Sequence, residues 1–484
     1  MKKFIILLSF VAVLSSCKKS LEEVPKSFIS KANFYKTESD AQAAIRGVYS
    51  SFGTDYYGIT YYLFVVLHSD YANGRGSQAP ISIFDHLLDQ TNIDRAAQNW
   101  STLYQAINRA NSVLDNVPGI ENMGDDVKSK ILAEAHFLRA MAYFNLVRGF
   151  GAVPIKTSES ADLSGIGSPR EPESKVYDLI IQDGLAAEKD LPESVGDQTG
   201  RASKYAAKML LAQVYLTLEK WKEAAAKAND VITGGRYSLV LVKKPDDFYK
   251  IFATITNPED VMSVHHSDTR RSEIPIYESR PNTPPYNYSS GGNFAWLPNL
   301  KSFIGDSWDN RDLRKSFNLY TKYIGPNGDS VSLPSSSPVL FKKFITSPQG
   351  FGSYSVPIYR YTEAFLIYAE ASCMADGAPS ALALERLNMI KRRAYGYDPT
   401  AVSPVDYPAG MSKDTFRNVV LNERAYEFLL EGRRWWDLKR TGRVKEAMLA
   451  AGRSFIDARL LWPIPTSEIN NNPAITQADQ NPGY

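Results

Sequence analysis

Hydrophobic residues recur with the period of an α-helix along most of this chain. Residues 94–117 and 127–150 place apolar side chains every three to four positions, and the turn sequence PGIENMGDD separates the two stretches. A shorter segment at 39–52 has the same period, and we expect it to begin at an N-cap formed by Ser39 or Asp40. The pattern therefore predicts a mainly α-helical protein.

Two further segments have the composition of paired helices that stack on their neighbours. Residues 204–232 and 365–394 alternate small and large apolar side chains, with Ala207, Ala212 and Ala224 as small positions in the first segment. Each segment resembles a tetratricopeptide hairpin, in which small residues let two helices approach closely. We expect a tetratricopeptide-like helical-repeat scaffold, which supplies a framework and not an active site.

The helical period is lost at residues 234–357. This stretch is rich in Pro and Gly and contains short strand-like runs such as 260–265. The sequence therefore predicts one domain over residues 38–484. In it, a loop-rich lobe with few short strands is inserted between the scaffold segments 38–233 and 358–484.

The end of the chain is unusually rich in proline. Because Pro lacks a backbone N–H and has a fixed φ, this segment is predicted to lie extended across the helical body and not to form a helix. The prolines concerned are Pro463, Pro465, Pro473 and Pro482.

A helix with three regularly spaced carboxylates is predicted within residues 421–443. Glu423, Glu427 and Glu431 repeat every four positions beside an apolar stripe, so they repel one another and need cations opposite them. The nearest cations along the chain are Arg424, Arg433 and Arg434. Two carboxylates at this spacing also lie about as far apart as those of a retaining glycosidase. The interleaved arginines favour an ion-paired packing helix.

The N-terminus reads as an export signal. Lys2 and Lys3 precede an apolar run at 4–14, which as a helix spans about 16 Å, roughly half of a bilayer core. The following sequence, LSSC, resembles a bacterial lipobox, in which cleavage after residue 16 leaves Cys17 as a lipidated N-terminus. An ordinary signal with a chance cysteine is the alternative. Residues 17–37 are then a polar tether.

Loss of residues 1–16 makes the chain formally neutral. It removes two of the 55 basic residues and none of the 53 acidic ones. Nucleic acid and anionic lipid surfaces both require a basic face, so neither is an expected partner. If Cys17 carries lipid, the other cysteine, Cys373, has no disulfide partner, and its Ala-rich helical surroundings predict a buried thiol.

A first set of candidate binding residues lies in a Tyr-rich stretch at 56–90, in a loop that contains Gly, Asn, Arg and Ser. Asp70, Asn73 and Arg75 offer hydrogen-bonding groups beside the aromatic ring of Tyr71. A saccharide needs this combination, because its hydroxyls bind planar polar groups and its ring faces pack on aromatic rings. An exposed turn in which Asp70 is a cap fits the same residues.

A second set lies in the aromatic and polar segment YESRPNTPPYNYSSGGNFAWLPNL. Tyr286, Tyr288 and Trp296 are candidates for stacking on a sugar ring, and Asn293 for binding its hydroxyls. Aromatic side chains that fix a long loop onto the protein body are the alternative interpretation.

The sequence lacks the common catalytic motifs. It contains no HExxH, CxxC, GxSxG, phosphate-binding loop or dinucleotide-binding glycine pattern, and His136 has no second histidine at metal spacing. We therefore predict no enzyme activity, no cofactor and no metal. A surface glycoside hydrolase stays open as an unfavoured alternative, because its two carboxylates can come from anywhere in a chain.

Two long motifs resemble the SusD-like (SusD/RagB) family of outer-membrane nutrient-binding lipoproteins. They are ERAYEFLLEGRRWWDLKRTG at 423–442 and LWPIPTSEINNNPAITQADQNPGY at 461–484. The resemblance implies a lipid-anchored protein on the outer membrane that faces the cell exterior. It also implies that the protein binds an oligosaccharide and hands it to a TonB-dependent barrel transporter. Peptide or another nutrient is the alternative cargo, because relatives match in the scaffold and vary in the binding loops.

Overall fold

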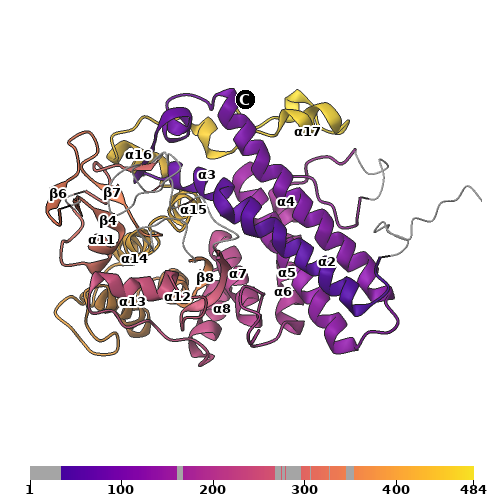
Figure 1. Cartoon of the computed structure of the whole chain (residues 1–484), viewed down its shortest axis with the longest axis horizontal. Coiled ribbons are helices and arrows are strands. Elements are labelled where there is room, and N and C mark those ends of the chain that lie inside the picture. Colours follow the sequence, from indigo (N-terminus) through magenta and orange to yellow (C-terminus); the bar gives the residue numbers. More distant parts are fainter. Residues whose placement is uncertain are drawn as a thin grey trace, which may run out of the picture.

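The computed structural model describes residues 34–160, 167–267, 274, 278, 296–305, 307–325, 327–344 and 354–484. The predicted signal sequence at 1–16, Cys17 and nearly all of the predicted tether lie outside these residues. Helices make up most of the described chain (Figure 1), so the predicted fold class is confirmed.

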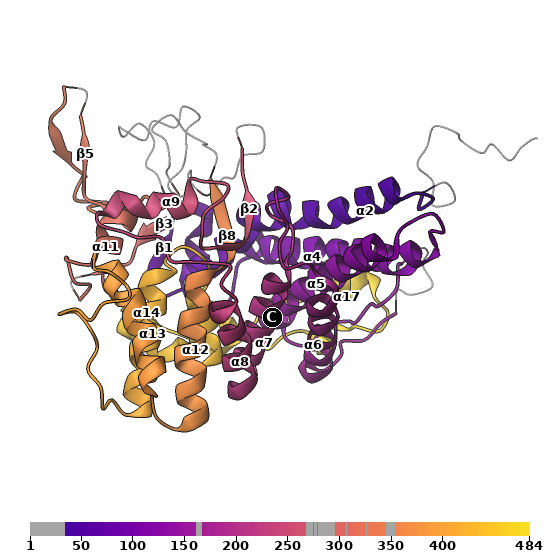
Figure 2. The same cartoon turned by 90° about the horizontal axis from the view of Figure 1, so that it is seen from below.

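The α-helices of the described chain are α2 (Glu38–Ser50), α3 (Tyr61–Leu67), α4 (Gln90–Asn116), α5 (Asp125–Phe150), α6 (Glu173–Asp190), α7 (Lys204–Thr217), α8 (Trp221–Thr233), α9 (Tyr249–Phe252), α11 (Leu313–Asn318), α12 (Tyr361–Asp376), α13 (Ala381–Ala394), α14 (Lys413–Glu427), α15 (Arg434–Arg440), α16 (Val444–Ala450) and α17 (Thr466–Asn471). The strands are β1 (Ala72–Gly74), β2 (Asp260–His265), β3 (Trp296–Pro298), β4 (Leu319–Tyr320), β5 (Lys322–Ile324), β6 (Ser330–Ser332), β7 (Leu340–Phe341) and β8 (Ser355–Arg360). Figure 2 shows α2, α9, β2 and β8 on one side of the molecule and α6, α8, α12 and α13 toward the opposite side.

Helices α4 to α8 pack in chain order, each against the next, and α12 packs against both α8 and α13. The predicted hairpins are therefore present as α7–α8 and α12–α13. Close approach depends on small residues: a Cβ built on Gly184 of α6 would lie 2.8 Å from a methyl carbon of Leu211 on α7. Cys373 of α12 is fully buried, as predicted, and burial raises the pKa of its thiol to about 11.

Within the described residues, the strands form short antiparallel pairs and no large sheet. The pairs are β1–β3, β2–β8, β4–β7 and β5–β6. Strand β2 coincides with the strand-like run predicted at 260–265, and β3 to β7 also lie within residues 234–357. The prediction of few short strands in this part of the chain is therefore confirmed.

The first helix differs from its prediction at both ends. Its N-cap is Thr37 and not Ser39 or Asp40, because the Thr37 hydroxyl accepts from the backbone N–H of Asp40 and the Asp40 carboxylate accepts from that of Thr37. At its C-terminus, α2 continues without a break into a π-helix, Ser51–Thr60, and then into α3. The sequence analysis missed this π-helix, which widens the helix between Ser50 and Tyr61.

The closing segment contains the helix α17, which the proline pattern was predicted to exclude. Pro465 is the N-cap of α17, where its missing N–H is not needed, and Pro473 follows the helix end. The rest of the segment does cross the helical body. Trp462 donates its backbone N–H to the Gly149 carbonyl of α5 at 2.9 Å, and the Asn481 amide donates to the Phe150 carbonyl at 2.9 Å.

Candidate ligand-binding groove

Glu423, Glu427 and Glu431 lie in a buried ion-pair cluster, completed by Glu259, Arg314, Lys343, Arg360 and Arg393. Glu427 is the most connected member. Its carboxylate is 3.0 Å from Arg314 Nη1 and 2.6 Å from Arg360 Nη1, and it also pairs with Arg393. The need for cations opposite these carboxylates was correctly predicted from their spacing.

The identity of those cations was wrongly predicted. The partners come from α11, β8, α13 and the segment after β7, whereas Arg424 and Arg433 pair with Glu363 and Arg434 pairs with Asp70. The reason is geometric. Arg424 is one position from Glu423 and points to a different face of α14, and the other two arginines lie beyond the helix end.

The ion-pair cluster leaves no carboxylate available as a glycosidase acid or nucleophile. Glu423 and Glu427 are 1% and 4% exposed. Burial by itself would raise the pKa of Glu427, yet the charges of its arginine partners outweigh it and hold that pKa well below its usual range. Burial raises the pKa of Glu423 against the attraction of Arg314. This pair therefore holds α14 in place and does not line a substrate site.

Asp70 and Tyr71 have structural partners and not surface positions. Asp70 is 4% exposed, and its carboxylate is 2.7 Å from Arg434 Nη2. Tyr71 is 1% exposed, and its hydroxyl accepts from the backbone N–H of Leu430 at 3.1 Å. Burial corrects the prediction for the ring of Tyr71, whereas Asp70 lines a cavity of about 330 Å³ beside Arg434.

Trp296 is also buried, with no exposed side-chain area, at the start of β3 opposite Gly74. Its ring packs into the core and cannot stack on a sugar in this conformation, so the alternative interpretation describes it correctly. Asn73 is half-buried and accepts from Arg453 Nη2 at 2.8 Å, and Arg75 is exposed. Tyr286, Tyr288 and Asn293 lie outside the described residues. Of the described candidates, Asp70 and Asn73 line two different cavities and not a common one.

A groove of about 750 Å³ lies between the first helix and β2. We call it the α2–β2 groove. Four segments that are far apart in the sequence line it: α2 with the start of the π-helix, the loop at 198–201, strand β2 and one residue of β8. The lining residues are Arg46, Gly47, Tyr49, Ser50, Phe52, Gly53, Gln198, Thr199, Gly200, Arg201, Met262, Ser263, Val264, His265 and Ile358.

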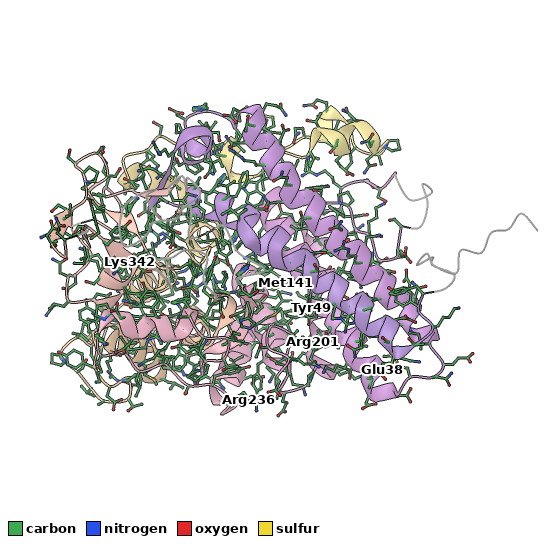
Figure 3. All side chains as sticks on the ribbon, in the orientation of Figure 1. Glu38, Tyr49, Met141, Arg201, Arg236 and Lys342 are labelled. Atoms are coloured by element: carbon green, nitrogen blue, oxygen red, sulfur yellow. The ribbon has the colours of Figure 1, made fainter. Side chains whose placement is uncertain are left out.

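The rim of the α2–β2 groove is polar and held by hydrogen bonds. The Tyr49 hydroxyl accepts from the backbone N–H of Ala202 at 2.9 Å, and the Arg201 guanidinium lies 5.9 Å from the Tyr49 ring (Figure 3). Behind Arg201, the buried Glu134 carboxylate accepts at 2.5 Å. These contacts join the loop at 198–201 to α2.

The opposite end of this loop is fixed by a close backbone approach. Gly200 has φ +85°, and a Cβ built on it would lie 3.3 Å from the His265 ring and 3.3 Å from the Ser263 carbonyl oxygen. A larger residue would be strained here and would press on β2. The His265 Nδ1 atom is hydrogen-bonded to the Ser355 hydroxyl at 2.8 Å, which fixes the ring orientation.

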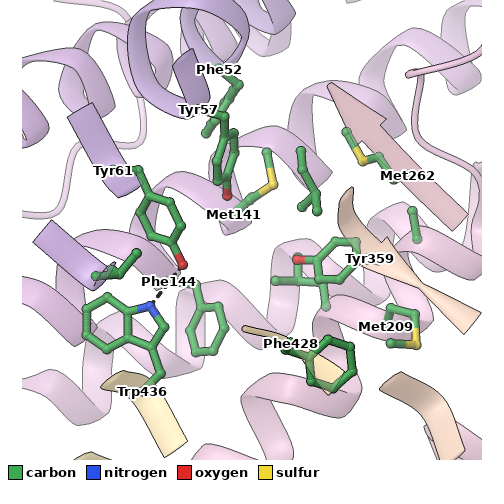
Figure 4. Packing of buried hydrophobic residues seen from close by; sticks show 14 of the residues in the cluster. Phe52, Tyr57, Tyr61, Met141, Phe144, Met209, Met262, Tyr359, Phe428 and Trp436 are labelled. Carbon is green, nitrogen blue, oxygen red and sulfur yellow. Dashed lines mark hydrogen bonds between the residues drawn. The ribbon is translucent and has the colours of Figure 1, made fainter. Parts of the chain in front are cut away.

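The floor of the α2–β2 groove is apolar. Phe52, Met262 and Ile358 are almost fully buried and belong to the hydrophobic core, which continues below them through Met141 and Tyr359 (Figure 4). An apolar floor with convergent polar groups at the rim is the usual composition of a small-molecule site. The same combination suits a saccharide, which has apolar ring faces and polar edges.

Sequence reasoning missed the α2–β2 groove because no motif connects its segments. Arg46, Gln198 and His265 come from three elements that meet only in the folded chain. The available signal was local: Tyr49 and Phe52 occur with Ser50 and Gly53 at the end of a predicted helix, where the π-helix begins. π-Helical turns are frequent at functional sites.

The described chain provides neither a metal site nor a membrane-spanning helix. Over those residues, no group of three or more His, Cys, Asp or Glu side chains could hold a metal ion. His136 pairs with Asp183 at 2.6 Å, as expected for a histidine between two helices. Nor does the described part of the chain contain a helix that is long and apolar enough to cross a bilayer.

Two family models match separate parts of the chain. Residues 22–216 match a family described as "Starch-binding associating with outer membrane", and residues 335–484 match the SusD family. The second match includes both motifs at 423–442 and 461–484. Together the two matches span the first helices, the α7 hairpin helix and everything from β7 onward.

Characterised relatives and solved structures agree with these matches. The chain is 28% identical to SusD-like protein P2 of Formosa agariphila over the full length of both, and 23% identical to a SusD-like protein of Bacteroides ovatus over 90% of this chain and 82% of that protein. A SusD superfamily protein from Parabacteroides distasonis superposes with a TM-score of 0.77 at 25% identity, covering 92% of this chain and 99% of the other. A laminarin-binding SusD-like protein superposes with a TM-score of 0.72 at 24% identity, covering 93% and 100%, and shares the fold.

Proposed function

Because the chain belongs to the SusD-like family, we propose that it is a lipoprotein on the outer face of the outer membrane. In this proposal it binds an oligosaccharide in the α2–β2 groove and delivers it to a TonB-dependent barrel transporter. The description of the N-terminal family supports association with the outer membrane. The LSSC sequence supports lipidation at Cys17.

The observation that carries the proposal is the α2–β2 groove itself. Its volume of about 750 Å³ is in the usual range for small-molecule sites. Its apolar floor can pack against sugar ring faces, and Ser50, Gln198 and Thr199 on its rim can exchange hydrogen bonds with hydroxyls. Ser50 and Gln198 are exposed, so a ligand can enter and leave from the surface, as delivery to a transporter requires.

Two solved structures of this fold are described as saccharide-binding proteins, one for laminarin and one, from Bacteroides fluxus, as a surface glycan-binding protein. Both likenesses support binding without chemistry on the ligand. The burial of Glu423 and Glu427 supports the same conclusion for this chain. We therefore propose no catalytic step.

Obstruction of the α2–β2 groove tests the proposal. A Cβ built on Gly47 meets no atom within 4 Å, so a large side chain can project into the groove without a clash at its base. We expect Gly47→Trp to weaken oligosaccharide binding at least tenfold, about 1.4 kcal/mol. The measurement is calorimetric titration of the soluble form that begins after Cys17 against a panel of neutral and charged oligosaccharides.

Gly119→Trp is the matched control. Gly119 is exposed, also has no atom within 4 Å of a built Cβ, and does not line the groove. Equal binding by the wild type and Gly47→Trp would remove the groove from the proposal. Binding to no oligosaccharide in the panel would redirect the cargo to peptide or another nutrient.

Delivery is tested separately, with the full-length lipoprotein in its membrane. We expect it to co-purify with a large barrel protein from detergent-solubilised outer membrane. We also expect Cys17→Ala to release it from the membrane fraction. Purification without any barrel protein would contradict the transporter part of the proposal and leave saccharide binding in place.

A further inference from the structure

We propose that the α2–β2 groove selects acidic oligosaccharides, whose carboxylate or sulfate groups pair with Arg46. This inference rests on the proposed function, because it names the chemical class of the ligand bound in the same groove. Two observations support it. The described side chains that line the groove include basic residues and no acidic ones, and one of the basic residues, Arg46, is exposed.

Arg46 is a free cation on the rim. It projects from α2 and is exposed, and within the described chain its guanidinium makes no ion pair and no hydrogen bond to another residue. Arginine presents two parallel N–H groups that fit the two oxygens of a carboxylate or a sulfate. Arg46 is therefore available to a ligand without breaking any contact of the folded protein.

Of the two other described arginines at the groove, Arg201 is paired with Glu134, so Arg109 is the one that adds positive charge. Arg201 lines the groove and Arg109 supports it from behind, where its Nη1 donates to the Gly47 carbonyl at 3.0 Å and to the Ser51 hydroxyl at 2.8 Å. No described carboxylate lies within 4 Å of the Arg109 guanidinium, and both of its acceptors are neutral. Arg109 thus contributes an uncompensated charge just below the rim.

The described lining of the α2–β2 groove carries no negative charge, and two carboxylates behind it are engaged with other groups. Of the described residues that line it, none is Asp or Glu. Glu134 is fully buried and neutralises Arg201, so it has no free charge for Arg46 or Arg109. Asp260 lies behind His265, with its Oδ2 3.8 Å from the His265 Nε2 and its Oδ1 accepting from the Ser263 hydroxyl.

The described lining of the groove therefore has an excess of positive charge, on a chain that is formally neutral without residues 1–16. Such a local excess raises the concentration of anionic ligands at the groove and favours them over neutral ones. The apolar floor still requires a sugar ring above it. An oligosaccharide with regularly placed carboxylate or sulfate groups satisfies both requirements, whereas a free small anion satisfies only the first.

The test compares probes that differ only in charge. An oligogalacturonate is titrated beside the same oligomer in fully methyl-esterified form, and a sulfated galactan oligosaccharide is titrated beside its desulfated form. We expect at least one charged member to bind at least tenfold more tightly than its neutral partner. We also expect its affinity to fall as salt is raised, because an exposed charge is screened within about 10 Å at 0.1 M salt.

Arg46→Gln identifies the residue responsible. We expect it to weaken the charged probe about three- to tenfold, to leave the neutral partner unchanged, and to reduce the salt dependence. The control Lys222→Gln removes an exposed charge on α8, outside the groove, and should change neither probe. The carboxylate and sulfate arms show which group is preferred.

The outcomes distinguish failure of the acidic-sugar proposal from failure of saccharide binding as a whole. Binding of neutral oligosaccharides at the groove with equal or weaker binding of every charged partner overturns selectivity for acidic sugars and keeps saccharide binding. Equal loss of charged and neutral binding in Arg46→Gln overturns the role of the charge. Failure of the whole panel, neutral and charged, overturns both proposals together.

Discussion

Arginine has opposite roles in two regions of this molecule. In the ion-pair cluster, Arg360 is 2% exposed and is paired with the carboxylates of Glu427 and Glu431. On the rim of the α2–β2 groove, Arg46 is exposed and makes no ion pair in the described chain. A buried charge must be paired to be tolerated, whereas an exposed charge keeps its water and is free for a ligand.

The charged side chains of the two regions have different roles. In the ion-pair cluster they stabilise the fold, and on the groove rim we propose that one of them binds a ligand. The ion-pair cluster joins α11, α13, α14 and β8, so it fixes elements that are distant in the sequence. The groove is lined by elements that are equally distant in the sequence, but the side chains of Arg46, Ser50 and Gln198 on its rim are exposed to solvent. Removing a charge from the first region should therefore cost stability, and removing one from the second should cost only binding.

The largest effect is expected from Glu427→Ala. It leaves the guanidinium groups of Arg314, Arg360 and Arg393 buried with fewer carboxylates, and a broken buried pair costs about 3–5 kcal/mol. Chemical denaturation followed by circular dichroism measures the loss. Glu385→Gln is the control, because the Glu385 side chain is 43% exposed and its pair with Arg392 is worth at most about 1 kcal/mol. Equal losses in the two variants would contradict the assignment.

Asp70→Asn should destabilise the protein less, by about 3 kcal/mol, because it breaks one buried pair and keeps the shape of the side chain. It also distinguishes a structural role of Asp70, through its pair with Arg434, from the predicted ligand-binding role. We expect oligosaccharide affinity to stay within twofold of the wild type once the variant is folded. A selective loss of affinity without loss of stability would restore Asp70 as a ligand-binding residue.

Asp260 differs from the charged residues of both regions. Its side chain is nearly buried, unlike Arg46, yet no described Arg or Lys lies within 4 Å of its carboxylate, unlike the carboxylates of the ion-pair cluster. Burial raises its pKa to about 6, and burial also lowers the pKa of its neighbour His265, so that ring gives little compensation. A raised acid pKa means that the folded state holds the proton more tightly. The contribution of Asp260 to stability is therefore fully present below about pH 4 and is lost as pH rises through 6.

The pH dependence is measured against Asp260→Asn, which cannot titrate. Between pH 7.5 and 4.5 the wild type should gain about 2 kcal/mol relative to this variant, from denaturation midpoints at each pH. The comparison with the variant cancels other buried groups, such as Glu278, whose pKa burial raises to about 8. A wild type that loses stability relative to the variant on acidification would reverse the sign and contradict the argument.

The sequence predicted regular elements well and three-dimensional partners poorly, for a physical reason. Helical periodicity depends only on residues close together in the sequence, so helices α4, α5, α7 and α12 could be predicted from it. The strand-like run at 260–265 predicted strand β2 in the same way. The partners of Glu427 come from residues 34 to 113 positions away, and no local pattern encodes such pairings. Repulsion among the carboxylates predicted that cations lie opposite them. Which residues supply these cations could be seen only in the folded structure.

The candidate site was harder to predict for the same reason. Trp296 and Tyr71 were chosen because aromatic rings suit sugars, yet aromatic rings are also the largest apolar groups available to a core, and both are buried. Composition alone cannot tell whether an aromatic ring binds a sugar or packs in the core. The α2–β2 groove depends on a π-helix and on a glycine loop at 198–201, whose effect appears only when β2 lies against them.

The smallest effect on stability is expected from Arg46→Gln, and it completes the comparison. Because Arg46 contacts no described carboxylate and is exposed, its replacement should change the free energy of unfolding by no more than about 0.5 kcal/mol. The same denaturation assay used for Glu427→Ala measures it, so the two arginine environments are compared on one scale. A loss above about 1 kcal/mol would mean that Arg46 stabilises the fold. Its charge would then have a structural role and would not be free to bind a ligand.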